Sequence, residues 1–162
     1  MKVVVRQYQP EDKIQLIGLM ETLQDFLVDI DPLHRLRRLP SYGKVYTKSL
    51  LAKVRKAGGI IYLAIERQDV VGCIVGVIEV QRQEEVVGEY PSVTGRILEL
   101  IVKEKNRGQG IGLKLMEKME TYFRINGCDF VRVECFVPNV SAYGFYLQLH
   151  YHDRMIDLVK QL

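Results

Sequence analysis

The chain has 162 residues, of which 48% are hydrophobic and 27% are charged, values close to those of ordinary globular proteins. This composition excludes disordered and collagen-like chains, and the length predicts one domain, residues 1–162. The 23 Lys and Arg residues against 20 Asp and Glu give a net charge of +3, a surplus too small to indicate a nucleic-acid-binding protein.

Membrane, secretory and metal-site patterns are not found. The longest apolar run, 70–80, is much shorter than the roughly 20 residues that cross a bilayer, so we expect no membrane partner. The first residues lack a secretory signal pattern, which favours a cytoplasmic protein. The three cysteines lack disulfide or zinc-site spacing, so we expect no structural metal.

Helix and strand signals alternate along the first part of the chain. A β-branched run predicts a strand over 3–8, and apolar residues at three- and four-residue spacings predict a helix from Ile14 to Ile30. The irregular stretch 33–48 predicts a loop with a short helix, and 46–56 a second helix that ends at glycines.

The remainder predicts mostly strands, with two further helices. Strands over 60–66 and 70–80 form a hairpin with a three-residue turn at 67–69. The further elements are a strand over 96–102, a helix from the glycine cluster to about 126, a strand over 130–137, a helix over 141–149 and a strand over 151–159. This order predicts an α/β (α+β) fold with a mixed sheet.

The densest chemical signal is a glycine-rich turn between a strand and a helix, made of Arg107, Gly108, Gln109, Gly110, Ile111 and Gly112. Glycines let a ligand approach the backbone, and the positive end of the helix favours a phosphate. The turn by itself is also compatible with a tight strand-to-helix connection. It matches neither the ATP-binding loop nor the dinucleotide fingerprint.

Two motifs in this order resemble the Gcn5-related N-acetyltransferase (GNAT) superfamily. The motif Gln/Arg-x-x-Gly-x-Gly/Ala, which binds the pyrophosphate of acetyl-coenzyme A in that family, is matched by Arg107, Gly110 and Gly112. The motif Asn-x-x-Ala-x-x-Phe/Leu-Tyr is matched by Asn139, Ala142, Phe145 and Tyr146. The clear resemblance covers about residues 95–151, whereas the N-terminal half agrees only in its order of elements.

The resemblance implies a donor site. It implies a single-domain fold with a mixed, mostly antiparallel sheet that is flanked by helices and splayed where acetyl-coenzyme A binds. Backbone groups of Leu100, Ile101 and Val102 would bind the pantetheine arm, and Asn139 would hydrogen-bond it. The loop 107–112 would hold the pyrophosphate through its N–H groups.

The resemblance also implies an activity, the direct transfer of an acetyl group from acetyl-coenzyme A to a primary amine of a small molecule or peptide. Tyr146 would be the general acid that protonates the departing thiolate. A phenol with a pKa of about 10 is protonated at neutral pH and can supply that proton. A packing role for this ring is the alternative.

The amine needs a base because an alkylamine with a pKa of about 10.4 is almost fully protonated at pH 7. Glu134 and Glu99, at positions where relatives carry acids, are the candidates, and neither is preferred over the other or over a solvated role. His152 is a weaker third candidate. Cys135 has no histidine at a partner spacing, so we reject an acyl-cysteine route.

Other functions and departures from the family remain open. A non-catalytic acyl-coenzyme A sensor would use the same loop, and a nucleic-acid-binding domain would use the basic cluster 35–38, which is more typical of a solvated loop. Tyr42 and Tyr46 either line the acceptor pocket or pack elsewhere. His150 stands where the family often has a helix-ending glycine. The family also suggests a homodimer.

Overall fold

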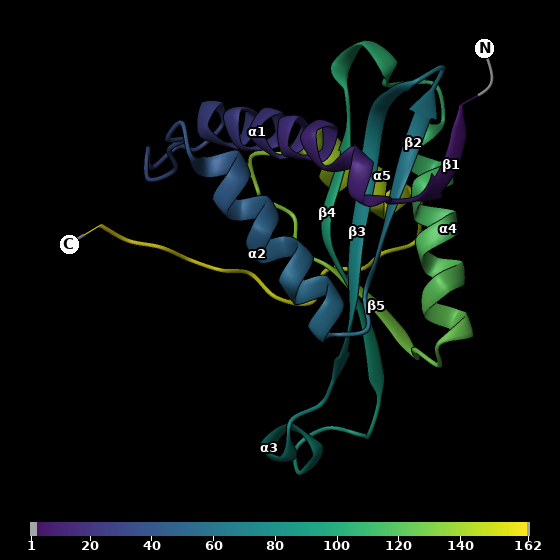
Figure 1. Cartoon of the computed structure of the whole chain (residues 1–162). Helices are drawn as coiled ribbons and strands as arrows, with labels where there is room; N and C mark the ends of the chain where they lie inside the picture. Colours follow the sequence, from purple (N-terminus) through teal and green to yellow (C-terminus); the bar gives the residue numbers. More distant parts are fainter. Residues whose placement is uncertain (1–2, 162) are drawn as a thin grey trace.

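The computed structural model describes residues 3–161 and contains one five-stranded sheet with helices on both faces (Figure 1). The strands are β1 (Val4–Gln7), β2 (Ile60–Glu66), β3 (Asp69–Val80), β4 (Val93–Val102) and β5 (Phe130–Val133). They lie side by side in this order, and every pair is antiparallel except the parallel pair β4–β5. The predicted mixed, mostly antiparallel sheet is confirmed.

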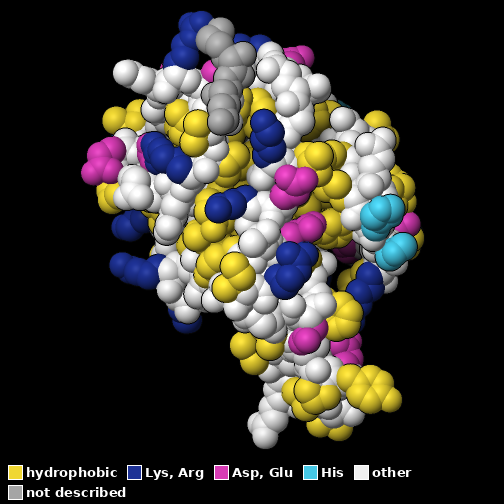
Figure 2. Space-filling view, turned by 90° about the vertical axis from the view of Figure 1, so that its right-hand side faces the viewer, with side chains coloured by type: hydrophobic (Ala, Val, Ile, Leu, Met, Phe, Trp, Pro, Cys, Tyr) yellow, Lys and Arg dark blue, Asp and Glu magenta, His cyan; other side chains and the backbone are white. Residues whose placement is uncertain are grey.

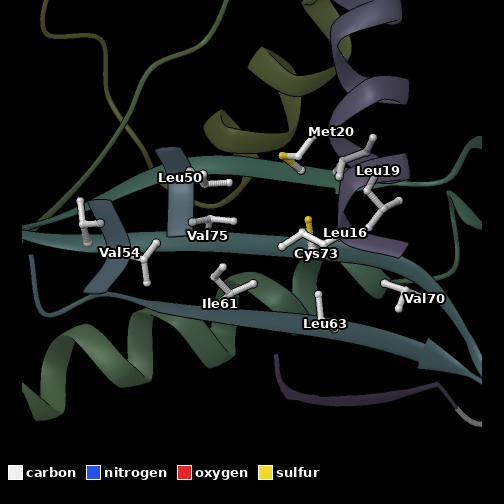
Figure 3. Close-up of a cluster of buried hydrophobic side chains, with 12 residues drawn as sticks. Leu16, Leu19, Met20, Leu50, Val54, Ile61, Leu63, Val70, Cys73 and Val75 are labelled. Atoms are coloured by element: carbon white, nitrogen blue, oxygen red, sulfur yellow. The ribbon is translucent and has the colours of Figure 1, made fainter. Parts of the chain in front are cut away.

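The sheet separates the hydrophobic core into two layers, and helices cover each layer. The elements outside the sheet are η1 (Pro10–Asp12), α1 (Lys13–Asp29), α2 (Tyr42–Lys56), α3 (Gln83–Val86), η2 (Glu104–Asn106), α4 (Ile111–Ile125) and α5 (Val140–Gln148). On one face, Leu16 of α1 and Leu50 of α2 pack with Leu63 and Val75 of the sheet (Figure 3). On the other face, α4 and α5 cover the side chains that alternate with these.

The first difference from the prediction lies between α1 and α2. The stretch 33–48 is not a loop with a separate short helix, because α2 already begins at Tyr42. Gly43, which looks like a turn residue in the sequence, instead permits close helix packing: a Cβ there would lie 2.4 Å from Oε1 of Glu21. The preceding residues 33–41, which include the basic cluster 35–38, are exposed.

Four further predictions are wrong, three at the ends of strands and one over a whole segment. Glu66 pairs with Asp69, so the β2–β3 turn has two residues, and β4 begins at Val93 rather than at residue 96. Strand β5 ends at Val133 rather than at 137 because β4 and β5 diverge there. The segment 151–159 is not a strand, since in the described part of the chain it lies beside no sheet edge that pairs with it.

The end of α5 shows how the chain accommodates His150 in place of glycine. His150 has a φ of 64°, in the left-handed region. Its N–H donates to the carbonyl of Leu147 at 3.0 Å, and the N–H of Tyr151 donates to the carbonyl of Tyr146 at 3.1 Å. These two bonds form the usual left-handed helix end, so the helix stops where the family pattern predicts.

Exposed apolar side chains gather on a projection of the β3–β4 hairpin (Figure 2). Its tip carries Val86, Val87 and Tyr90, of which Tyr90 is 94% exposed. A second exposed apolar group lies on the C-terminal segment, where Met155 and Leu158 are 80% and 87% exposed. Between residues 3 and 161, no helix is both long and apolar enough to cross a membrane.

Candidate active site

The sheet is open where β4 and β5 part. The two strands pair only as far as Ile97 and Val133. Beyond that point Leu100, Ile101 and Val102 pair with β3 on one side and have no β5 partner on the other. The N–H of Lys103 donates to the carbonyl of Val71, so alternation along the strand turns the backbone groups of Leu100 and the N–H of Val102 away from β3. An extended ligand can bond these groups in the manner of an added strand, which fits the pantetheine arm.

The glycine-rich loop has the conformation of an anion cradle. Gly108 and Gly110 both have a φ of 73°, and a Cβ at either would meet no atom within 4 Å. Glycine is therefore favoured at these positions by the left-handed backbone conformation and not by lack of space. The first turn of α4 leaves backbone N–H groups without intrahelical acceptors, up to Lys114, whose N–H donates to the carbonyl of Gly110 at 3.1 Å. The geometry suits a phosphate at this helix end.

Arg107 and Gln109 are tied back to the protein. Nε of Arg107 donates to the carbonyl of Val102 at 3.0 Å, and its guanidinium lies 5.7 Å from the ring centre of Phe26. Nε2 of Gln109 reaches the carbonyl of Lys105 at 3.4 Å. The Arg107 side chain therefore fixes the loop to the end of β4, and the cradle itself is made by backbone groups.

The second motif meets the first at the start of α5. Asn139 caps this helix, with its Oδ1 accepting from the N–H of Ala142 at 3.2 Å. A Cβ on Gly112 would lie 3.4 Å from the ring of Phe145, so α4 and α5 approach each other closely at this point.

Burial raises the pKa of the Cys135 thiol, which agrees with its rejection as a nucleophile.

Tyr146 is a buried phenol between two other rings. It is 8% exposed, and its ring centre lies 5.6 Å from that of Phe145 and 5.8 Å from that of Tyr151. Burial raises the pKa of Tyr146, and the nearby Cys135 and Glu99 raise it further. The hydroxyl therefore stays protonated at neutral pH, as a general acid requires.

Glu99 lies in a pocket of about 400 Å³ between α2 and β4. The pocket is lined by Tyr46, Ser49, Leu50, Lys53, Arg96, Ile97, Leu98, Glu99 and Glu134. Tyr46 donates a hydrogen bond from its hydroxyl to Oε1 of Glu99. Burial raises the pKa of Glu99, although the Tyr46 hydrogen bond and the charge of Lys53 act in the opposite direction.

Glu134 borders the same pocket but has a different environment. Its side chain is 62% exposed and accepts from Arg96 at 2.8 Å and from Arg132 at 3.0 Å. Arg96 also binds Glu79 at 3.0 Å, so the carboxylate of Glu134 belongs to a charge network at the rim. His152 is exposed on the C-terminal segment and does not line the pocket.

A bulge in β4 explains why Glu99 reaches this pocket. Val75 pairs with Glu99 and Gly76 with Ile97, so Leu98 is an extra residue. Ile97 packs on the side of α4, and regular alternation would have placed Glu99 there too. The bulge turns Glu99 toward α2, and the sequence analysis did not identify it.

Lys53, Ser49 and Arg96 also line the pocket and were missed. The spacing of Tyr46, Ser49 and Lys53 on one face of α2 is the signal that could have indicated the first two. Among the described residues, no group of three or more His, Cys, Asp or Glu side chains is placed to hold a metal ion.

Known proteins with similar sequences are N-acetyltransferases by name. The chain is 38% identical over 72 residues to an uncharacterised N-acetyltransferase of Methanocaldococcus jannaschii, a match covering 44% of this chain and 46% of that protein. It is 30% identical over 150 residues to a probable N-acetyltransferase of Arabidopsis thaliana, a match covering 78% of this chain and 33% of that protein. The chain thus spans less than half the length of these relatives.

Solved structures share the fold over nearly the whole chain. A mutant of the BH1408 protein from Bacillus halodurans has a TM-score of 0.86 at 18% identity, covering 98% of this chain and 99% of that one. Glucosamine-6-phosphate N-acetyltransferase from Arabidopsis thaliana has a TM-score of 0.71 at 18% identity, covering 99% of both chains. The profile of the acetyltransferase (GNAT) family matches residues 20–151. The chain therefore belongs to the acetyltransferase (GNAT) family.

Proposed function

We propose that the protein is an acetyl-coenzyme A-dependent N-acetyltransferase that transfers the acetyl group directly to a primary amine of a small molecule or peptide. The observation that carries this proposal is the open edge of β4, which has Glu99 on the α2 face and Tyr146 on the α5 face. Family membership and the names of the relatives support it.

The donor would lie along that open edge. Within the stretch Leu100, Ile101 and Val102, the backbone groups that point away from β3 would hold the pantetheine arm. The loop 107–112 would hold the pyrophosphate, and Asn139 would hydrogen-bond the arm. When bound, acetyl-coenzyme A supplies an acetyl group activated as a thioester.

The residues of this chain would move two protons. The Glu99 carboxylate would take a proton from the acceptor ammonium, which leaves a neutral amine. As the new N–C bond forms and the C–S bond breaks, the Tyr146 hydroxyl would give its proton to the leaving sulfur. The nitrogen, positively charged after the attack, would lose its second proton to solvent and become the amide, and the Tyr146 oxygen would regain a proton from solvent. Glu99 is preferred to Glu134 as the base because Glu134 is exposed and paired with two arginines.

The acceptor amine would bind in the pocket between α2 and β4. The pocket contains both signs of charge, from Lys53 and Arg96 and from Glu99 and Glu134, and Tyr46 also lines it. A primary amine can enter such a pocket as an ammonium ion, bind the Glu99 carboxylate and lose its proton there.

We propose further that residues 1–162 form one N-acetyltransferase domain that works in the cytoplasm without a nucleic-acid or membrane partner. A homodimer is proposed from the exposed apolar side chains of the C-terminal segment, such as Met155 and Leu158. Sedimentation of the full chain and of a variant ending at residue 152 tests this. A full chain that sediments as a monomer would contradict it.

Thiol release tests the activity. The protein is incubated with acetyl-coenzyme A and a panel of small amines, aminoglycosides, polyamines and peptide N-termini, and free coenzyme A is measured. Release with at least one amine is expected, whereas none across the panel contradicts the proposal. Donor-induced thermal stabilisation without any turnover would favour the acyl-coenzyme A sensor. Strongly salt-dependent binding to nucleic acid would favour a role for the cluster 35–38.

A further inference from the structure

Tyr46 lies where α2 passes over the open part of β4, and its hydroxyl donates to Oε1 of Glu99. Its ring stacks on that of Tyr42, one turn earlier in α2, with ring centres 5.2 Å apart and planes inclined by 9°. This stacking on one helix face restricts rotation of the Tyr46 ring. The hydroxyl that meets Glu99 is therefore held in place from α2, not from the sheet.

The hydrogen bond from the Tyr46 hydroxyl fixes the orientation of the Glu99 carboxylate, which lies at the end of a flexible side chain. The chain of Glu99 has three rotatable bonds, and the bulge at Leu98 only brings it to the correct face of the sheet. With Oε1 fixed by Tyr46, Oε2 is the oxygen left to receive a proton. A base fixed in this way is aligned before the acceptor binds.

We infer that Tyr46 is a positioning residue for acetyl transfer: its hydroxyl, held by the Tyr42 stack, orients the Glu99 carboxylate before the acceptor binds. As a donor to the carboxylate it also favours the charged form. This inference rests on the proposed function, in which Glu99 is the base. Tyr46 itself exchanges no proton with the acceptor.

The other groups that act on Glu99 come from three elements. They are Tyr42 and Lys53 of α2, Cys73 of β3 and Tyr146 of α5. Burial raises the pKa of Tyr42 to about 12, and burial also raises the pKa values of Cys73 and Tyr146, so these three groups are neutral at pH 7. Lys53 therefore contributes a positive charge near Glu99, and Tyr46 contributes the hydrogen bond. Arg96 and Glu134, which are paired with each other, also line the pocket.

The substitution Tyr46→Phe keeps the stacked ring and removes only the hydroxyl. Because this hydroxyl stabilises the charged carboxylate, we expect the midpoint at which Glu99 titrates to rise by about one pH unit. Carbon NMR of protein with labelled glutamate carboxyls measures this midpoint without any substrate, and Glu99→Gln assigns the signal. The acid limb of kcat/KM should move upward by the same amount, with an unchanged KM for acetyl-coenzyme A.

Tyr143→Phe is the matched control. Its hydroxyl also donates to a carboxylate, that of Asp153 at 2.8 Å, but neither residue lines the pocket. The Glu99 titration should be unchanged in this variant. Tyr42→Leu is a second test that keeps the Tyr46 hydroxyl and removes the stack, and it should raise the Glu99 midpoint by less than Tyr46→Phe does.

The two readouts separate the inference from the proposed function. An unchanged Glu99 midpoint in both Tyr46→Phe and Tyr42→Leu overturns the inference, whether or not any amine is acetylated. A raised midpoint without turnover on any amine supports the positioning role and counts against the proposed reaction. Because the titration needs only folded protein, circular dichroism of each variant is recorded first.

Discussion

Glu99 of β4 and Glu134, the residue after β5, border one pocket but have opposite surroundings. Glu99 receives a hydrogen bond from the Tyr46 hydroxyl, and burial raises its pKa. Glu134 is 62% exposed and neutralised by Arg96 and Arg132. Of the two carboxylates, only Glu99 is held in conditions that suit a base working near neutral pH.

The first prediction separates these two carboxylates by substitution. Glu99→Gln removes the proposed base, so kcat/KM for the amine should fall by about 100-fold or more. Glu134→Gln removes a rim charge and should change it less than about threefold. Steady-state thiol release at pH 7.5 measures both. A large loss in Glu134→Gln with little loss in Glu99→Gln would reverse the assignment.

The second prediction concerns pH and stability together. Because the pKa of Glu99 in the folded protein is raised, its ionised form costs stability above that pKa, and this cost disappears as the pH falls through it. Glu99→Gln should therefore melt at a higher temperature than the parent protein at pH 7. The difference should shrink toward acidic pH. Thermal melts over pH 4–8 measure it, and a constant difference would contradict the raised pKa.

The third prediction tests Tyr146 as the acid. Tyr146→Phe keeps the buried ring between Phe145 and Tyr151 and removes the proton donor. We expect kcat to fall by about 100-fold, with the affinity for acetyl-coenzyme A changed less than about threefold. Turnover and calorimetric donor binding are measured on the same preparation. An unchanged kcat would remove Tyr146 from the mechanism.

The fourth prediction uses the end of α5. His150 has a φ of 64°, a conformation that glycine adopts without strain. His150→Gly should raise the free energy of unfolding by about 0.5–1 kcal/mol. His152→Gly, in an exposed segment without helix or strand, serves as the control and should give no gain. Urea unfolding measures the free energy of unfolding of both variants, and an equal value for the two would contradict the prediction.

The fifth prediction contrasts two glycines. A Cβ at Gly95 would lie 2.3 Å from the ring of Phe123, which is fully buried, so Gly95→Ala should destabilise the protein by about 1–3 kcal/mol. A Cβ at Gly18, on the exposed side of α1, would meet nothing within 4 Å. Gly18→Ala should stabilise by about 0.5–1 kcal/mol. Equal effects would mean that Phe123 can move aside.

The sequence was most informative where chemistry depends on neighbours in the chain. The glycine-rich turn 107–112 lies between a strand and a helix as predicted, and the helix after it begins at Ile111. Pairing of β4 with β5 stops at Ile97, which agrees with the predicted splayed sheet. The glycine-rich turn depends on residues that are adjacent in the chain, and the splayed sheet was implied by the family resemblance of the two motifs.

The sequence was least informative where distant elements meet. The face to which Glu99 points depends on a bulge at Leu98, and the hydrogen bond to Glu99 comes from Tyr46, 53 residues earlier in the chain. The apolar segment 151–159 has the pattern of a strand, but a strand forms only against a partner edge. Such outcomes depend on tertiary packing, which residue spacing does not record.

The parting of β4 and β5 links the stability of the protein to its donor. Beyond Ile97 the sheet has backbone groups that lie ready for a partner, and the proposed donor would supply the missing hydrogen bonds. The folded state would then gain free energy with the logarithm of donor concentration. The amide hydrogens of Leu100 and Val102, which point away from β3, would then exchange more slowly in the donor complex than in the free protein. The resistance of the folded protein to unfolding would thus increase with the concentration of acetyl-coenzyme A, even when no amine is present to be acetylated.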